Sequence, residues 1–328
     1  MDTRQQQFHE EYPVAFDRCL HRFREQLTPT RCSDLRKDGF VVIDNFLGRG
    51  WALALLQEMR WLNKNGLMKP NETQFSHPNG QRLQFSKPNI FEVDLHDDGI
   101  RNRLPEMNAL FHQDELVEAL AEAFPEGLRL SRGTQGRTLK LQRNAGSGGC
   151  FPLHYDNPGL PNKRALTCLL YLNPDWKDGD GGEVCLKPFL KKEKAIAPLL
   201  DRLVIFRSDR VLHRVLPCNA ERFMLTVWVD SPDVNSPEES TLRVTNSQLR
   251  DWLGFCEFIR HSPVQRTLSR GVYEEQYEES LRDCMKGAEG FDEMLEAHRA
   301  QVARLKKNKG LYGIIERLRQ TAALAALA

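Results

Sequence analysis

The chain has 328 residues, of which 40% are hydrophobic and 28% charged, as in an ordinary soluble globular protein. Its 46 basic and 45 acidic residues give a formal net charge of +1, so bulk charge favours neither nucleic acid nor an anionic membrane as a partner. Its apolar runs are far shorter than the roughly 20 residues of a membrane span.

The eight cysteines are scattered along the chain, with no C-x-x-C pair among them. The first residues, MDTRQQQFHEEYP, also lack the apolar core of a secretory signal. Together these features are typical of reduced thiols rather than of a disulfide framework. We therefore expect a cytoplasmic protein, or a nuclear one, that is not secreted.

Residues 1–34 are polar but carry aromatic and apolar residues near helical spacing, which predicts an N-terminal helix that covers a sheet. The main domain is expected at 35–232, and it opens with a strand at 38–44 and a helix at 53–62. Residues 63–98 are rich in Asn, Gln, His, Pro and Lys, with repeated turn signals. This composition predicts a long irregular loop, of the kind that is often functional.

A second helix, at 116–124, precedes a series of short apolar segments separated by turns. This pattern predicts an α+β fold built on a double-stranded β-helix, or jelly-roll barrel, with buttressing helices. The expected strands are 138–143, 151–155, 165–172, 183–187, 203–206, 211–216 and 222–229.

Three residues of these strands have the composition of a metal site. His154 and Asp156 are two residues apart on an extended segment, so their side chains point the same way. His213 follows 57 residues after Asp156 and can return on another strand. Two imidazoles and one carboxylate leave half of an octahedron open, which is the facial triad of non-haem iron(II) oxygenases. Zinc in a hydrolase uses the same ligand types, and a buried histidine is often only a hydrogen-bonded core residue.

Arg222 lies nine residues after His213, on a strongly strand-like segment. Its side chain shares one face of that strand with Met224, Thr226 and Trp228. A guanidinium fork beside the metal suits a carboxylate held in a partly dry pocket. Iron with such an anchor one strand away suggests 2-oxoglutarate as the co-substrate.

The order of these residues, and the sequence segments around them, resemble those of the 2-oxoglutarate- and iron(II)-dependent oxygenases. Five segments are similar to the prolyl 4-hydroxylase branch, and particularly to its oxygen-sensing prolyl hydroxylases: "HYDNP", "TCLLYLNPDW", "GGEVCLKPF", "DRLVIFRSDRVLHRV" and "RFMLTVWVD". The resemblance runs over about 139–230 and more weakly from 38–47. It implies Fe(II) held by His154, Asp156 and His213, dioxygen as second co-substrate, L-ascorbate as reductant, and a role in oxygen sensing.

The resemblance also implies that the hydroxyl of Tyr171 helps Arg222, with Thr226, to hold the far carboxylate of 2-oxoglutarate. One position departs from the pattern: ten residues before the first ligand, the oxygen-sensing enzymes have a tyrosine near the metal, and this chain has Asn144. Their affinities for oxygen and co-substrate are therefore not carried over to this chain.

The expected reaction is hydroxylation of a protein or peptide substrate at C4 of a proline residue, with release of succinate and carbon dioxide. The loop at 63–98 supports a polypeptide substrate, because it is placed where the resembling enzymes carry a mobile loop that closes over a peptide. Two alternatives stay open. One is an oxygenase of a free amino acid or other small metabolite, and the other is a metal-dependent binding or regulatory module without turnover.

The composition shifts after Pro232, where a Ser/Pro/acidic linker leads into a region with repeated helical patterns. We expect a helical C-terminal extension at 233–328 with four amphipathic faces. These helices can pack on the barrel, on each other, on a partner, or on a second copy of the chain through 236–328.

Overall fold

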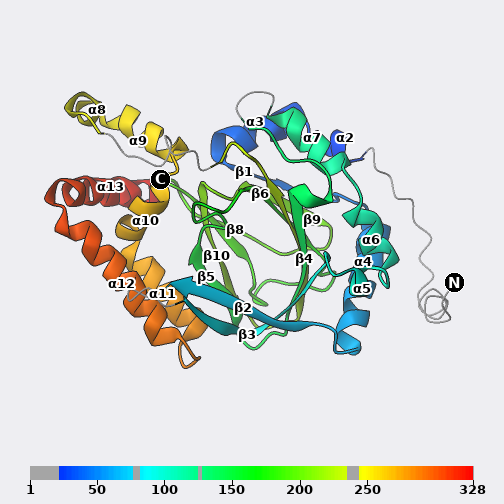
Figure 1. Cartoon of the computed structure of the whole chain (residues 1–328). Coiled ribbons are helices and arrows are strands. Elements are labelled where there is room, and N and C mark those ends of the chain that lie inside the picture. Colours follow the sequence, from blue (N-terminus) through cyan, green and yellow to red (C-terminus); the bar gives the residue numbers. More distant parts are fainter. Residues whose placement is uncertain (1–21, 77–81, 125–127, 235–243, 328) are drawn as a thin grey trace.

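The computed structural model describes residues 22–76, 82–124, 128–234 and 244–327, which form two antiparallel sheets flanked by helices on both sides (Figure 1). The expected α+β class is confirmed in this respect. The expected N-terminal helix lies largely outside the described residues. The helices are α2 (Arg22–Gln26), α3 (Pro29–Asp38), α4 (Arg49–Lys64), α5 (Asp98–Arg101), α6 (Pro105–Phe111), α7 (Glu115–Ala123), α8 (Asn246–Arg250), α9 (Trp252–His261), α10 (Gln265–Val272), α11 (Glu274–Met285), α12 (Phe291–Lys307) and α13 (Lys309–Leu327), with a 3-10 turn η1 (Thr134–Gly136).

The larger sheet has seven described strands in the order β1-β9-β6-β11-β4-β3-β2, and the smaller sheet has four in the order β5-β10-β7-β8. Every strand expected from the apolar segments is present, with ends that differ by at most two residues. The strands are β1 (Phe40–Ile43), β2 (Lys69–Ser76), β3 (Arg82–Asp94), β4 (Arg137–Asn144), β5 (Gly149–His154), β6 (Arg164–Tyr171), β7 (Val184–Pro188), β8 (Lys194–Ile196), β9 (Arg202–Arg207), β10 (Val211–Cys218) and β11 (Arg222–Asp230).

Apolar side chains separate these elements into layers. Between the two sheets lies a core that includes Tyr171, Leu186, Phe206 and Met224. On the other face of the larger sheet, α3, α4, α6 and α7 contribute to a second core, with residues such as Trp51 fully buried. Burial of one large apolar side chain stabilises the fold by roughly 1.5–3 kcal/mol, so these layers fix the strands that carry the candidate site.

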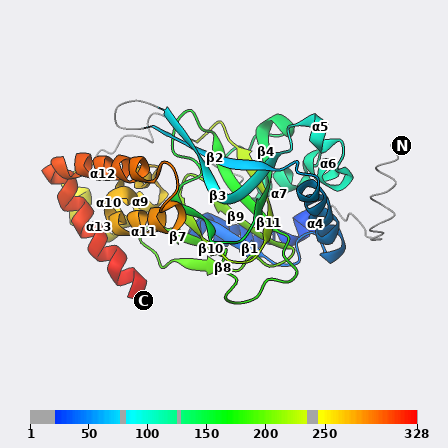
Figure 2. The same ribbon diagram turned by 90° about the horizontal axis from the view of Figure 1, so that it is seen from below.

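Residues 69–76 and 82–94 form the two strands of a β-hairpin, so the expectation of a long irregular loop at 63–98 is wrong for most of its length. Strands β2 and β3 pair antiparallel, and the end of β3 pairs with β4, which joins the hairpin to the larger sheet. Pro70 and Pro88 suggested turns, but proline is tolerated in edge strands and beside bulges, and the pairing shifts register between Pro70 and Glu72. The hairpin reaches across the smaller sheet towards α11 and α12 (Figure 2).

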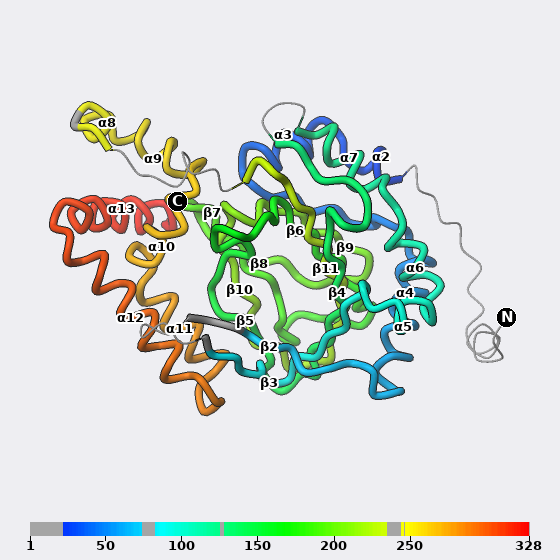
Figure 3. Tube along the Cα trace, in the orientation of Figure 1, coloured from blue at the N-terminus to red at the C-terminus, as the bar shows by residue number. Residues whose placement is uncertain are grey.

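The C-terminal extension is helical, as expected, and it packs on the outer face of the smaller sheet. Apolar residues of α9, α10, α11 and α13 share one core with residues of β5 and β10 and of the turn after β7 (Figure 3). Hydrogen bonds across this interface include one from the amide of Leu153 to Ser280 Oγ (3.0 Å) and one from the amide of Leu190 to the Tyr273 hydroxyl (3.0 Å). None of the described helices is long and apolar enough to cross a membrane.

A disulfide joins Cys150 on β5 to Cys284 on α11. The expectation of reduced thiols is therefore wrong for this pair, whose members are 134 residues apart in sequence and meet only because the extension folds back on the sheet. Among the described cysteines, the others are free and buried: Cys32, Cys168, Cys185, Cys218 and Cys256. The boundaries proposed at 34/35 and 232/233 stay predictions.

Candidate metal centre

The structure brings His154, Asp156 and His213 together. His154 ends β5, and His213 is its cross-strand partner on β10. Asp156 follows just beyond β5, with Oδ1 3.4 Å from His154 Nε2 and Oδ2 3.7 Å from His213 Nε2. One ligand atom from each residue lies within 4.8 Å of the others, which is a spacing that a single metal ion can bridge.

Backbone carbonyls orient both imidazoles towards this point. Nδ1 of His154 lies 2.7 Å from the carbonyl of Pro152, and Nδ1 of His213 lies 3.2 Å from the carbonyl of Val211. Because a carbonyl only accepts, each Nδ1 donates, and each Nε2 keeps its lone pair for a metal. Burial, reinforced by the neighbouring His154, lowers the pKa of His213 to about 4, so this imidazole is neutral at pH 7.

Asp156 is held by two donors from the larger sheet. Its Oδ2 accepts hydrogen bonds from Thr167 Oγ1 (2.7 Å) and from Trp228 Nε1 (3.1 Å). Burial alone would raise the pKa of this carboxyl, but His213, His154 and the Thr167 hydroxyl together hold it well below its usual range. The carboxylate is thus ionised and fixed in direction before any metal arrives.

Thr167 and Trp228 were not assigned a role from the sequence. The signal was present, however, because Trp228 shares a strand face with Arg222, and Thr167 shares one with Tyr171. Strand alternation would have placed both of them on the side of the sheet that faces the predicted ligands.

Arg222 and Tyr171 lie deep in the same core, 1% and 0% exposed. The guanidinium carbon lies 5.0 Å from the centroid of the Tyr171 ring, because Tyr171 on β6 pairs with Met224, two residues along β11 from Arg222. Within the described parts of the chain, no residue outside this pair offers a hydrogen-bond partner to the three guanidinium nitrogens or to the phenol hydroxyl. A buried cation without a partner is costly, so this pocket is built for an anion.

The surroundings of Arg222 support that interpretation. Burial raises the pKa of the Tyr171 hydroxyl, which keeps it protonated and able to donate. Gly182 lets the chain pass close to the Arg222 side chain, since a Cβ there would lie 2.9 Å from Arg222 Cδ. Thr226 is buried on the same face of β11, between Arg222 and Trp228, as the sequence predicted.

The hydrogen bonds given by the Asn144 side chain go to the backbone of a turn and not to the predicted metal ligands. Its amide nitrogen donates to the carbonyl of Gly149 (2.7 Å), and its amide oxygen accepts from the backbone of Gly146 (3.1 Å). The side chain is fully buried and holds the glycine-rich turn between β4 and β5. At this position the chain uses its polar group for the turn rather than for the metal centre.

A cleft of about 670 Å³ opens beside His154, between the β2–β3 hairpin, β5 and the helices α10–α12. Lys87 of the hairpin lies over it, with its ammonium 4.3 Å from the centroid of the Phe151 ring. Burial lowers the pKa of Lys87 to about 8, against the opposing pull of Glu92 and Asp156, so the group stays largely charged at pH 7.

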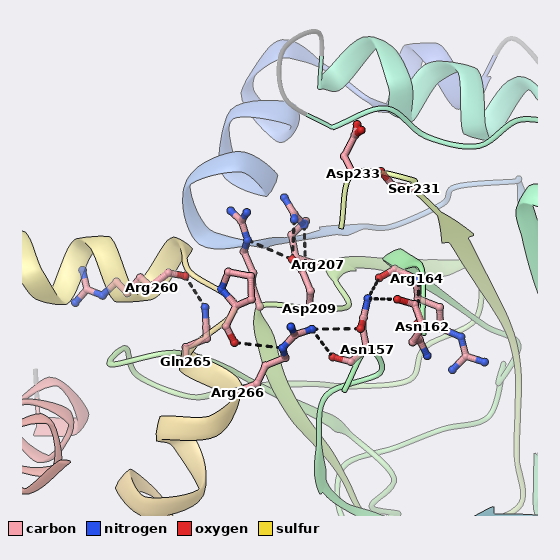
Figure 4. A network of polar contacts seen from close by, with 12 residues as sticks. Asn157, Asn162, Arg164, Arg207, Asp209, Ser231, Asp233, Arg260, Gln265 and Arg266 are labelled. Carbon is pink, nitrogen blue, oxygen red and sulfur yellow. Dashed lines mark hydrogen bonds and ion pairs between the residues drawn. The ribbon is translucent and has the colours of Figure 1, made fainter. Parts of the chain in front are cut away.

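The extension also fixes the loop that follows Asp156. Arg266 at the start of α10 donates to the backbone oxygen of Asn157 (3.0 Å) and to its side-chain oxygen (3.2 Å). The amide group of Asn157 in turn donates to the carbonyl of Arg164 (2.7 Å), as Figure 4 shows. A helix far along the sequence therefore holds the residue next to a predicted metal ligand.

Comparison with known proteins gives matches over the same residues. The model of the 2OG-Fe(II) oxygenase superfamily matches residues 139–230. A solved structure of a prolyl 4-hydroxylase from Phytophthora capsici is 51% identical, with a TM-score of 0.84, over 95% of this chain and 98% of that one. The Caenorhabditis elegans hypoxia-inducible factor prolyl hydroxylase and the mouse prolyl hydroxylase EGLN3 are each 28% identical over 59% of this chain.

The matches differ in extent. This chain spans 27% of the nematode protein and 79% of the mouse protein, and both matches leave about two fifths of this chain uncovered. A prolyl hydroxylase of Trichoplax adhaerens, solved with a hypoxia-inducible factor peptide, is 24% identical with a TM-score of 0.53 over 70% of this chain and all of that one, which shows a common fold. The Phytophthora protein, by contrast, matches almost the whole chain.

Proposed function

Because this chain belongs to the 2OG-Fe(II) oxygenase superfamily and to its prolyl 4-hydroxylase family, we propose that it hydroxylates a proline residue of a protein substrate at C4. Fe(II) is the cofactor, 2-oxoglutarate and dioxygen are co-substrates, and succinate and carbon dioxide are released. The observation that carries the proposal is the combination of the His154, Asp156 and His213 cluster with Arg222, a buried cation to which no described carboxylate is paired.

The residues fit the groups that the family implies. Two imidazoles and one carboxylate offer three ligands on one side of a metal and leave the other positions open, which suits Fe(II). Arg222 and Tyr171 offer a guanidinium fork and a hydroxyl to the far carboxylate of 2-oxoglutarate, with Thr226 beside them. When bound, Fe(II) and its co-substrates supply the oxidant for a C–H bond.

The chain's own part in this chemistry is positioning. Thr167 and Trp228 hold Asp156, and two backbone carbonyls hold the imidazoles, so the ligands need no rearrangement on binding. The apolar core around Tyr171 and Met224 excludes water from the carboxylate anchor. The proposal includes the closure of the two sheets into a double-stranded β-helix around this anchor.

Several finer roles belong to the same proposal. L-ascorbate is proposed as the reductant that keeps the iron as Fe(II), and an apparent KM for dioxygen near tissue concentrations would support a role in oxygen sensing. A cytoplasmic or nuclear location is also proposed, as is self-association or contact with a partner protein through 236–328. Fractionation of cells and the mass of the purified protein in solution test these two points.

Incubation with a cell lysate and with a panel of free amino acids and metabolites tests the substrate class. We expect a mass gain of one oxygen on proline residues of a protein, dependent on added 2-oxoglutarate and assigned to C4 by comparison with hydroxyproline standards. Oxygen gained by a free metabolite, with no hydroxyproline in any protein, would contradict the proposal and favour a metabolite oxygenase. No succinate under any condition would favour a binding module.

A further inference from the structure

We infer that the C-terminal extension forms one wall of the substrate groove and selects polypeptides with acidic residues beside the reactive one. The inference rests on the proposed function for the reaction, but it concerns binding alone. The groove is the cleft beside His154, and helices α10, α11 and α12 provide most of the wall opposite β5. Its lining is Thr73, Lys87, Phe151, Pro152, Leu153, His154, Tyr155, Pro158, Arg266, Thr267, Arg270, Tyr277, Leu281, Met294, Ala297, His298, Gln301, Arg304 and Leu305.

Charge in this groove has one sign. Four of its lining residues are lysine or arginine, and among the described residues that line it none is an aspartate or a glutamate. The whole chain, with 46 basic and 45 acidic residues, has no such bias. A cleft lined by one sign of charge attracts ligands of the opposite sign, and here three of the four cations belong to the extension.

Three of the cations are available to a ligand. Arg266 is engaged with the loop after Asp156. Lys87, Arg270 and Arg304, in contrast, form no ion pair with any described carboxylate. The guanidinium of Arg270 lies over the Tyr277 ring, 4.2 Å from its centroid, which directs it without neutralising it.

Apolar surface lies between these charges. Phe151 and Tyr155 come from the segment that carries His154, and Met294 and Leu305 come from α12. An extended peptide whose target residue faces the metal would thus meet apolar surface with cations at its edges. The matching substrate is a segment in which apolar and acidic residues are interspersed on either side of the reactive residue.

Two contacts fix the helical wall of the groove relative to the wall formed by β5 and the hairpin. Cys150 on β5 is bonded to Cys284 on α11. At the other end, the Phe85 ring of the hairpin lies against Gly290, where a side chain would have no room. A groove with fixed walls recognises its ligand with little ordering cost, so charge and shape both contribute to selection.

Fluorescent synthetic peptides test the inference on the whole 328-residue chain. Each peptide has one central proline, and its flanks carry either Asp and Glu, or Asn and Gln, or Lys. By anisotropy we expect the acidic peptide to bind about tenfold tighter than the neutral one, with the advantage shrinking as salt rises. Arg304→Glu should remove most of this advantage and tighten binding of the lysine peptide, and Arg270→Gln should add to the loss.

Lys307→Glu is the matched control, because Lys307 is exposed on the same helix but does not line the groove. It should bind all three peptides as the unaltered protein does. Acidic peptides that bind no tighter than neutral ones, including no measurable binding of either, would overturn the inference, as would an equal effect of Lys307→Glu and Arg304→Glu. Succinate formation without peptide is measured separately, so failure of the proposed reaction and failure of the charge selection are distinguishable.

Discussion

Arg222 and Tyr171 face one another in the core between the two sheets, with the guanidinium carbon 5.0 Å from the ring centroid and, within the described chain, no hydrogen-bond partner outside the pair for either polar group. A folded protein rarely leaves a buried guanidinium unpaired. The pair therefore behaves as half of a binding site whose other half is a carboxylate. The core between the two sheets thus offers a site for the carboxylate of the proposed co-substrate, 2-oxoglutarate.

Replacement of Arg222 by Ala should weaken 2-oxoglutarate binding by roughly a hundredfold or more, because loss of one partner of a buried ion pair costs about 3–5 kcal/mol. Titration of 2-oxoglutarate into Mn(II)-loaded protein measures the effect, and metal affinity should change little. Arg222→Lys is the control, since it keeps the charge but not the fork and should bind at an intermediate level. Equal binding by the Ala variant would show that the carboxylate of 2-oxoglutarate binds at another place.

Removal of the donors to Asp156 should loosen the metal. Thr167→Val and Trp228→Phe each remove one hydrogen bond to the carboxylate. Valine keeps the shape of threonine, and phenylalanine keeps an aromatic ring at position 228. Such partners of ligands typically affect metal affinity by about 10–100-fold. Competition with a metal-binding dye measures the change. Unaltered Mn(II) affinity in both variants would show that the carboxylate is held by other means.

The metal ligands were predictable from the sequence because they obey short-range rules. Alternation along an extended segment predicted that His154 and Asp156 point the same way, and the two side chains do meet although β5 ends at His154. Arg222 follows His213 on a segment that is apolar enough to be a strand on its own. The β2–β3 hairpin could not be predicted by such short-range rules. Its strands are polar on exposed faces and contain Pro70 and Pro88, and its pairing with β4 depends on a free sheet edge that no local pattern reveals.

Acidification should destabilise the metal-free protein between about pH 6.5 and pH 4. In that window His213 is neutral when folded, with its pKa lowered to about 4, but protonated when unfolded. The unfolded state then binds more protons than the folded state. The free energy of unfolding therefore decreases as the pH is lowered, by up to about 3 kcal/mol. The depressed pKa of Asp156 adds a further loss below its ordinary range.

Urea unfolding in the presence of a chelator, at several pH values, measures this slope. His213→Gln should flatten it between pH 6.5 and pH 4, whereas His261→Gln, which alters an exposed histidine on α9, should not. Parallel slopes for the parent and His213→Gln would mean that the acid sensitivity has another origin.

Reduction should destabilise the attachment of the extension. The Cys150–Cys284 bond closes a long loop, and loss of such a bond typically costs about 2–5 kcal/mol. Dithiothreitol should therefore lower the urea midpoint of the parent but not that of Cys284→Ser. Cys256→Ser, at a free buried cysteine, should keep its sensitivity to reductant. Reaction of both thiols with iodoacetamide in unreduced, denatured protein would contradict the bond.

Long-range partners account for what the sequence did not reveal. Cys150 and Cys284 are too far apart in sequence for a spacing rule, and scattered cysteines suggested free thiols. Four helical faces of the extension could be predicted from their apolar periodicity, but not the surface that they cover. The groove beside His154 exists only because that packing occurs, so it could not be predicted.

Succinate formation by the purified 328-residue chain tests the central claim most directly. With Fe(II), ascorbate and 2-oxoglutarate, the parent should convert 2-oxoglutarate to succinate, and His213→Ala and Asp156→Ala should lose both this activity and bound metal. Metal content is measured in the same samples. Circular dichroism of each variant shows whether it is folded, which separates loss of a ligand from a folding defect. Succinate formed by either variant at the parent's rate would contradict the assignment of the metal centre.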